Sequence, residues 1–78
     1  MQLGTQLALF LDNRPGTLAE AAGIFAGNRA NIAALENTGR DELFSTYEVD
    51  LDVNDLAHLT RIVSALRASD AVAEAERI

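Results

Sequence analysis

The sequence predicts an α+β fold in which six elements follow one another in the order β-α-β-β-α-β. Two observations predict this order. Two segments carry apolar residues at helical spacing, and each is flanked by apolar or alternating stretches of strand length. A short turn joins the two middle strands, so a central hairpin connects two β-α-β units. We therefore expect a four-stranded antiparallel sheet with two helices on one face, the ferredoxin-like βαββαβ arrangement.

The first strand and the first helix flank a tight turn. Residues 6–11 form an apolar run that is short enough to be a buried strand. The Pro15-Gly16 step then forces a turn. Residues 17–26 carry apolar side chains at helical spacing, and the threonine that opens this segment has Glu20 three residues on, which is the pattern of a capping box. The sequence therefore predicts a strand, a turn and a capped helix.

The second and third strands form the predicted hairpin. Residues 30–38 are predicted as a strand and residues 39–41 as the turn after it. Residues 43–53 give the clearest strand, because two sets of residues alternate along it. The set predicted to be buried is Leu43, Ser45, Tyr47, Val49, Leu51 and Val53, and the largely exposed set is Phe44, Thr46, Glu48, Asp50 and Asp52. Residues 31–38 are our candidate for an edge strand that pairs side by side with another copy.

A second helix and a short strand complete the chain. Asn54 is predicted to cap this helix, with Asp55 in its first turn. His58 lies off the apolar stripe, so we expect it at the solvated surface. The stripe consists of Leu56, Leu59, Ile62, Val63 and Leu66. Residues 71–78 alternate weakly and are predicted to form a final strand at an edge of the sheet.

The chain length and the helix-free face of the sheet together predict a partner. The 78 residues make one domain, with Met1 to Thr5 outside the first predicted strand as a flexible or added start. Ala8, Phe10 and Phe44 fall on the face of the sheet that lacks helices. Apolar patches of this kind often mark interfaces. We therefore expect a homodimer through a sheet edge or face, or pairing with a neighbouring domain.

Composition excludes several classes of function. Six arginines stand against twelve acidic residues, and the net charge of −6 disfavours direct nucleic-acid binding by this domain alone. The absence of cysteine excludes disulfides and thiolate metal sites and fits a cytoplasmic location. No apolar run approaches the roughly 20 residues of a membrane helix. The chain contains no Ser/His/Asp or Cys/His set and no Walker-type phosphate loop, so we expect neither an independent enzyme nor a bound cofactor or metal.

The joint between the first strand and the first helix predicts a small-ligand site. It consists of Asp12-Asn13-Arg14-Pro15-Gly16-Thr17-Leu18. Backbone N–H groups at a helix N-terminus can hold a carboxylate or another small anion. Asn31 opens the second strand, and we expect its amide near the same joint. The alternative is purely structural, since turn chemistry alone accounts for the Pro15-Gly16 step and an Asx turn for Asn13.

These residues resemble the ACT domain family of small-molecule-sensing regulatory modules. The family pattern of an apolar strand, Arg-Pro-Gly-x-Leu and a later Asn-Ile is matched by Arg14-Pro15-Gly16-Thr17-Leu18 and Asn31-Ile32. Residues 55–67 and the closing Glu76-Arg77-Ile78 are similar to the C-terminal ACT domain of RelA/SpoT-type enzymes, which synthesise and hydrolyse guanosine tetra- and pentaphosphate, (p)ppGpp. The resemblance implies a regulatory segment whose catalytic domains lie elsewhere in a parent chain.

The first half is also similar to the ACT domain of 3-phosphoglycerate dehydrogenase. In that family, asparagines that match Asn13 and Asn31 hold serine between two subunits, helped by a histidine at the position of Leu11. Leucine departs from that pattern and offers the serine hydroxyl no polar partner. An apolar lining at this position favours an amino acid with an aliphatic side chain such as valine, leucine or isoleucine. The predicted ligand-binding residues are Leu11, Asn13, Gly16, Thr17, Leu18, Asn31 and Ile32, the last two from the same or a second subunit.

Three functions stay open on the sequence. The first is an amino-acid-sensing domain that controls (p)ppGpp synthetase/hydrolase activity in the stringent response. The second is a ligand-free dimerisation or docking domain, motivated by the apolar residues of the helix-free face. The third is a serine-type effector domain of an amino-acid biosynthetic dehydrogenase.

Overall fold

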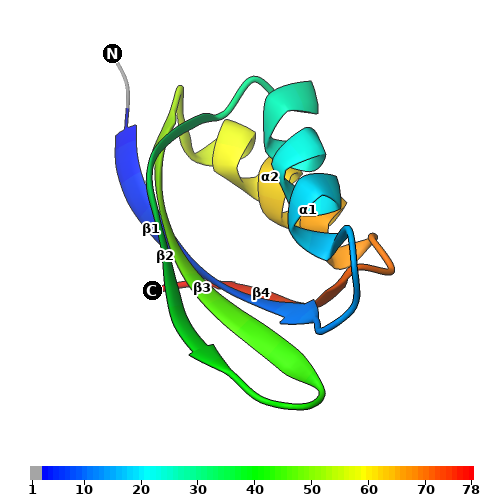
Figure 1. Cartoon of the computed structure of the whole chain (residues 1–78). Coiled ribbons are helices and arrows are strands. Elements are labelled where there is room, and N and C mark those ends of the chain that lie inside the picture. The colour runs from blue at the N-terminus through cyan, green and yellow to red at the C-terminus, as the bar shows by residue number, and fades with distance from the viewer. Residues whose placement is uncertain (1–2) are drawn as a thin grey trace.

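A computed structural model describes residues 3–78 and confirms the predicted fold class. The elements are β1 (Leu3–Asp12), α1 (Thr17–Gly27), β2 (Asn31–Arg40), β3 (Phe44–Val53), α2 (Leu56–Arg67) and β4 (Val72–Arg77). The four strands form one antiparallel sheet in the order β2-β3-β1-β4. Both helices lie on the same face of this sheet (Figure 1). The two edges of the sheet are therefore β2 and β4, as the sequence predicted for both.

The long pairing between β1 and β3 corrects the predicted start of the chain. β1 begins at Leu3, because its backbone pairs with β3 from the Leu3–Val53 pair to the Asp12–Phe44 pair. Thr5 is thus part of the sheet and not of a flexible start, while Met1 and Gln2 lie outside the described residues. Gly4 and Thr5 separate Leu3 from the apolar run, so the sequence alone placed the strand start too late.

The turn between β2 and β3 lies later than predicted. β2 continues to Arg40, so Gly39 belongs to the strand and residues 41–43 form the turn. The Asp41 carboxylate accepts hydrogen bonds from the backbone N–H groups of Leu43 and Phe44, each at 2.8 Å. These two hydrogen bonds lower the pKa of Asp41 below its ordinary value, the one to Phe44 more strongly. One carboxylate therefore fixes the hairpin turn.

The core lies between the sheet and the two helices. The predicted buried face of β3 is largely confirmed, with Ser45, Val49, Leu51 and Val53 buried, whereas Leu43 in the turn is exposed. The core residues that β1 and the helices contribute are Leu7, Leu9 and Leu11 from β1, Ala21 and Phe25 from α1, and Leu59, Ile62 and Leu66 from α2. Leu56, predicted in the apolar stripe of α2, is the first residue of that helix and is 57% exposed.

A β-bulge disturbs the alternation predicted for the last strand. The register between β1 and β4 shifts between Phe10 and Leu11. Val72 and Ala75, three residues apart, are consequently both buried, although strict alternation would place them on opposite faces. The bulge explains why the pattern of residues 71–78 indicated only a weak strand.

The caps of both helices differ from the prediction. α1 has Gly16 as its N-cap in the left-handed conformation, with φ of 86°, and no side chain caps it, so the capping box is not formed. α2 is capped by Asp55 and not by Asn54, since the Asp55 carboxylate accepts a hydrogen bond from the His58 N–H at 2.8 Å. Asparagine and aspartate are equally good caps, so the sequence did not separate the two neighbours.

His58 is buried, contrary to its predicted surface position. It is 3% exposed and lies between the end of α1 and the start of α2. Its Nδ1 accepts a hydrogen bond from the Asn54 N–H at 2.9 Å, and its Nε2 contacts the Asn28 carbonyl oxygen. Because Nδ1 is an acceptor, Nε2 carries the proton and donates to Asn28. His58 therefore ties together the ends of two helices.

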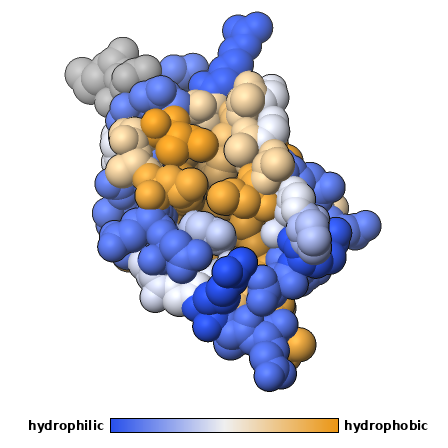
Figure 2. All heavy atoms as spheres, viewed as in Figure 1, coloured by the Kyte–Doolittle hydropathy of each residue, from blue (hydrophilic) through white to orange (hydrophobic). Residues whose placement is uncertain are grey.

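β2 is the uncovered edge of the sheet. Ile32 pairs with Leu51 and Leu35 with Val49, so both side chains lie on the same face as the core. They are nevertheless 37% and 45% exposed, and Leu18 of α1 is 38% exposed. Figure 2 shows apolar atoms gathered in the middle of this side of the molecule. No helix between residues 3 and 78 is long and apolar enough to cross a membrane.

Candidate functional site

The turn between β1 and α1 borders an open pocket of about 400 Å³. The Asp12 N–H donates to the Ala71 carbonyl oxygen at 3.0 Å, and the Asn13 N–H donates to the Leu43 carbonyl oxygen at 2.9 Å. The turn is thus held between the segment before β4 and the β2–β3 hairpin. The lining residues are Asn13, Arg14, Pro15, Gly16, Thr17, Leu18, Arg40, Ser45 and Tyr47.

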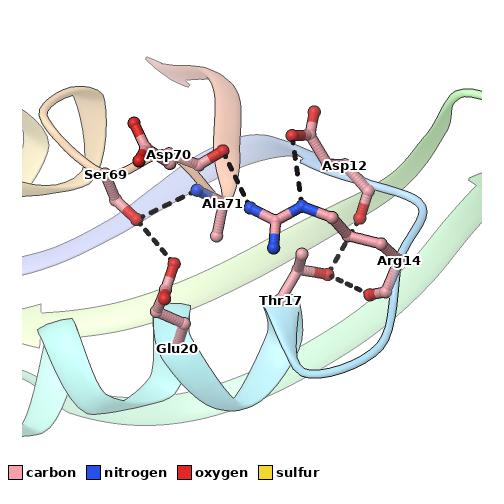
Figure 3. Close-up of polar contacts among 7 residues, drawn as sticks. All are labelled: Asp12, Arg14, Thr17, Glu20, Ser69, Asp70 and Ala71. Atoms are coloured by element: carbon pink, nitrogen blue, oxygen red, sulfur yellow. Dashed lines mark hydrogen bonds and ion pairs between the residues drawn. The ribbon is translucent and has the colours of Figure 1, made fainter.

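Thr17 fixes the entry into α1 without capping it. Its hydroxyl lies 2.9 Å from the Asp12 carbonyl oxygen and 3.2 Å from the Arg14 carbonyl oxygen, and it donates to these acceptors (Figure 3). Gly16 adopts a φ of 86° that a residue with a Cβ rarely adopts. Together they fold the chain back on itself, so that the backbone at the start of α1 borders the pocket.

Arg14 connects this turn to the segment between α2 and β4. Its Nε lies 3.6 Å from Asp12 Oδ2, and its Nη2 donates to the Asp70 carbonyl oxygen at 3.2 Å. Nearby, the Ser69 hydroxyl donates to Glu20 of α1 at 3.0 Å and accepts from the Ala71 N–H at 3.2 Å (Figure 3). These hydrogen bonds therefore connect the β1–α1 turn and α1 directly to the segment between α2 and β4.

The predicted site residues fall into three groups. Those of the turn, Asn13, Gly16, Thr17 and Leu18, all line the pocket. Leu11 does not, because it is completely buried in the core beneath it. Asn31 and Ile32 lie at the far end of β2, where Asn31 pairs with Asp52 and its amide donates to the Asp52 carboxylate at 3.2 Å. Within one chain, the expectation that Asn31 lies beside the joint is therefore wrong.

Five lining residues were not among the predicted ligand-binding residues, and three of these five lie outside the predicted joint. Arg40 ends β2 and pairs with Ser45 of β3, and Tyr47 follows on the same face. Ser45 is 4% exposed, while Tyr47 is half-buried and Arg40 is exposed. The signal in the sequence was Ser45, a polar residue within the otherwise buried set of β3. The position of Ser45 beside Arg40 follows from the β2–β3 register, and the sequence analysis did not obtain this register because it placed the turn too early.

The pocket carries positive charge and no acidic side chain. Arg14 and Arg40 line it, and none of the lining residues is aspartate or glutamate. Asn13 has a structural bond as well, since its amide donates to the Asp41 carbonyl oxygen at 2.8 Å. Among residues 3–78, no group of three or more histidine, aspartate or glutamate side chains is arranged to hold a metal ion. The site is thus suited to a small anionic or zwitterionic ligand.

Comparison with known proteins identifies the family. The family model for the ACT domain matches residues 2–77. The chain belongs to the ACT domain family. Over 66 residues it is 44% identical to the GTP pyrophosphokinase rsh of Brucella ovis and 42% identical to that of Brucella suis. These matches cover 85% of this chain and 9% of either relative, so the chain spans about a tenth of the length of these curated relatives.

Solved structures agree with the family assignment. The crystal structure of the ACT domain from GTP pyrophosphokinase of Chlorobium tepidum superposes with a TM-score of 0.84 over all of both chains, at 19% identity. A homoserine dehydrogenase from Thiobacillus denitrificans superposes with a TM-score of 0.71 at 27% identity, covering 97% of this chain and 17% of the dehydrogenase. The resemblance to an ACT domain of the RelA/SpoT type is therefore confirmed, and this ACT domain is itself non-catalytic.

Proposed function

We propose that this ACT domain binds a small amino acid, with a branched-chain side chain favoured, and so controls the (p)ppGpp synthetase/hydrolase activity of a cytoplasmic parent enzyme in the stringent response. The observation that carries this proposal is the pocket at the β1–α1 turn, which presents a helix N-terminus, Arg14 and Arg40 next to the exposed side chain of Leu18. A carboxylate suits the charged part and an aliphatic side chain suits the apolar part.

A second copy of the chain completes this site in our proposal. β2 is an open edge of ten residues, and open edges pair readily with other strands. If β2 pairs antiparallel with β2 of a second copy, the Asn31–Ile32 end of one strand meets the Arg40 end of the other. Ile32 lies on the core-side face, which is also the face of Ser45 and Tyr47. Ile32 of the second copy then adds an apolar wall to the pocket.

In our proposal, the polar contacts of the turn transmit ligand binding to the catalytic domains of the parent enzyme. Arg14 bonds to the Asp70 carbonyl, and Ser69 bonds to Glu20. A ligand that binds one arrangement of these segments better than another shifts the equilibrium between them. The catalytic domains that sense this shift are partners expected in the parent chain.

A titration followed by two-dimensional NMR tests the proposal. The 78-residue chain is titrated with valine, leucine, isoleucine and serine, and we expect shifts at residues 13–18, 40 and 45–47 with the aliphatic amino acids. Leu18→Gln is expected to weaken binding about tenfold, since it removes apolar contact from the pocket wall. Leu56→Gln is the matched control, an exposed helical leucine outside this pocket. No shift with any of these four amino acids at millimolar concentration would contradict the proposed function.

The dimer is tested separately by sedimentation. Leu35→Arg places a charge in the middle of the open β2 edge and is expected to abolish self-association, whereas Leu43→Arg in the hairpin turn is expected to leave it unchanged. Both leucines are exposed in the single chain, at 45% and 70%. Self-association that survives Leu35→Arg would point to the helix-free face of the sheet.

A docking domain without a ligand is the second candidate. Ala8, Phe10 and Phe44 lie on the helix-free face and are half-buried in the single chain, so apolar surface remains there. Serine binding, the third possibility raised by the sequence, is disfavoured because Leu11 is buried and the serine-binding histidine of the dehydrogenase family has no counterpart at this position.

A further inference from the structure

We propose that the pocket at the β1–α1 turn recognises its ligand by the carboxylate end, held by Arg40 and the Ser45 hydroxyl, and leaves an α-ammonium group without an ionic partner. This inference rests on the proposed function and names the part of the effector that is read. It also extends the class of ligands to α-keto acids, which share the carboxylate and lack the ammonium.

Of the two arginines that line the pocket, Arg40 is the one whose guanidinium is not engaged by other side chains or carbonyl groups of residues 3–78. The single ion pair between side chains of residues 3–78 joins Arg14 to Asp12, and Arg14 also donates to the Asp70 carbonyl oxygen. Arg14 is thereby held toward the α2–β4 segment (Figure 3). Arg40 has no such partner among the described residues. An arginine guanidinium binds a carboxylate through two parallel hydrogen bonds.

Two of the acidic residues that adjoin lining residues in sequence, Asp12 and Asp41, have other partners. The Asp12 carboxylate faces Arg14, and the Asp41 carboxylate accepts the Leu43 and Phe44 N–H groups in the hairpin turn. None of the residues that line the pocket is acidic, in a chain of twelve acidic residues against six arginines. A ligand ammonium in this pocket therefore finds oxygen atoms of amides and hydroxyls, but no carboxylate among the lining residues of one chain. The charged groups of the pocket can therefore recognise only the carboxylate end of the ligand.

Ser45 supplies the second donor. It is 4% exposed and pairs with Arg40 across the β2–β3 hairpin, so both side chains lie on the pocket face. Among residues 3–78, no fully buried side-chain nitrogen or oxygen lacks a hydrogen-bond partner, so the Ser45 hydroxyl, which has no such partner in this part of the chain, keeps some exposure to solvent. Ser45 is also one of the residues that line the pocket. A hydroxyl at the base of a pocket donates readily to a carboxylate oxygen.

Three related ligands separate the two ends of the effector. Valine, valinamide and the α-keto analogue of valine are titrated into the 78-residue chain and followed by two-dimensional NMR. Valinamide lacks the carboxylate and is expected to bind at least about tenfold more weakly than valine, because it loses a charge-assisted pair of hydrogen bonds. The α-keto acid lacks the ammonium and is expected to bind within about threefold of valine, which is less than one charged hydrogen bond contributes.

Two variants assign the carboxylate contact to residues. Arg40→Gln is expected to weaken valine and the α-keto acid equally, by about tenfold or more, and Arg40→Lys by less. Ser45→Ala is expected to weaken both by about fivefold. Arg61→Gln is the matched control, since Arg61 is an exposed arginine on α2 outside this pocket. Unchanged amide spectra away from the pocket establish that each variant is folded.

The outcomes separate this inference from the function on which it rests. If wild-type chain binds valine and Arg40→Gln binds it equally well, the carboxylate assignment is wrong while amino-acid sensing stands. If valine binds and the α-keto acid does not, the pocket reads the ammonium and the inference is overturned. If neither valine nor the α-keto acid binds, the proposed function and this inference fail together.

Discussion

The two edges of the sheet differ in what covers them. β4 is short, α2 packs against it, and Val72 and Ala75 are buried. β2 has ten residues, nearly all of them exposed, although Ile32 and Leu35 lie on the same face as the core. The comparison teaches that this small domain keeps most of its packing in the half formed by β1, β3, β4 and α2. The half formed by β2 and the hairpin borders the pocket and offers an edge to a second chain.

The largest expected difference in stability is between the loss of a leucine from the covered half and the loss of a leucine from the open half. Leu66 on α2 is completely buried, and Leu66→Ala is expected to lower the free energy of unfolding by about 2–5 kcal/mol. Leu35→Ala on β2 is expected to cost less than about 1 kcal/mol, as for a surface substitution. Urea unfolding of dilute protein measures both. Equal losses would mean that β2 is covered in the single chain and that the comparison is wrong.

His58 provides the next largest effect, since it joins α1 to the covered half. His58→Ala removes the acceptor of the Asn54 N–H and the donor to the Asn28 carbonyl. We expect a loss of about 2 kcal/mol in the free energy of unfolding, the cost of leaving buried polar groups unpaired. Arg61→Ala, one helical turn away and exposed, is the control and is expected to change stability by less than about 0.5 kcal/mol. Matching values for the two variants would contradict a tying role for His58.

Local patterns predicted the fold, and long-range contacts account for what they missed. The alternation in β3 and the spacing of Leu59, Ile62 and Leu66 depend on neighbours in sequence, so they were visible without the structure. The burial of His58 depends on where α1 ends in space. For the candidate site, Asn13 and Gly16 were found because the turn is local, whereas Arg40 enters the pocket only through the β2–β3 register.

A smaller effect is expected at the N-terminus of α2, where the sequence did not identify the capping residue. Asp55 and Asn54 are adjacent and chemically similar, yet only the Asp55 side chain accepts the His58 N–H. Asp55→Ala is expected to lower the free energy of unfolding by about 1 kcal/mol, the usual value of an N-cap. Asn54→Ala is the matched control and is expected to cost less than about 0.5 kcal/mol. If Asn54→Ala lowers the free energy of unfolding more than Asp55→Ala does, in thermal or urea unfolding, Asn54 is the cap, as the sequence predicted.

The smallest expected effect lies in the open half, at the hairpin that borders the pocket. The pKa of Asp41 is lowered by its hydrogen bonds to the Phe44 and Leu43 N–H groups. A carboxyl group whose pKa is lower in the folded chain stabilises the fold above its unfolded pKa, and this stabilisation is lost as the pH falls through the lowered folded pKa. Wild-type chain should therefore lose more stability between neutral pH and the acid range than Asp41→Asn.

Urea midpoints at a series of pH values measure this difference, with Glu42→Gln as the control because Glu42 makes no such turn bonds. Asparagine keeps an amide oxygen that can accept the same two N–H bonds, so Asp41→Asn removes the charge and preserves the turn. The Asp41 carbonyl also accepts the Asn13 amide, which ties the hairpin to the β1–α1 turn. If Asp41→Asn keeps the full pH dependence of wild-type stability, the carboxylate contributes nothing to the hairpin. The hairpin is then held by its backbone pairing and by the Asn13 amide.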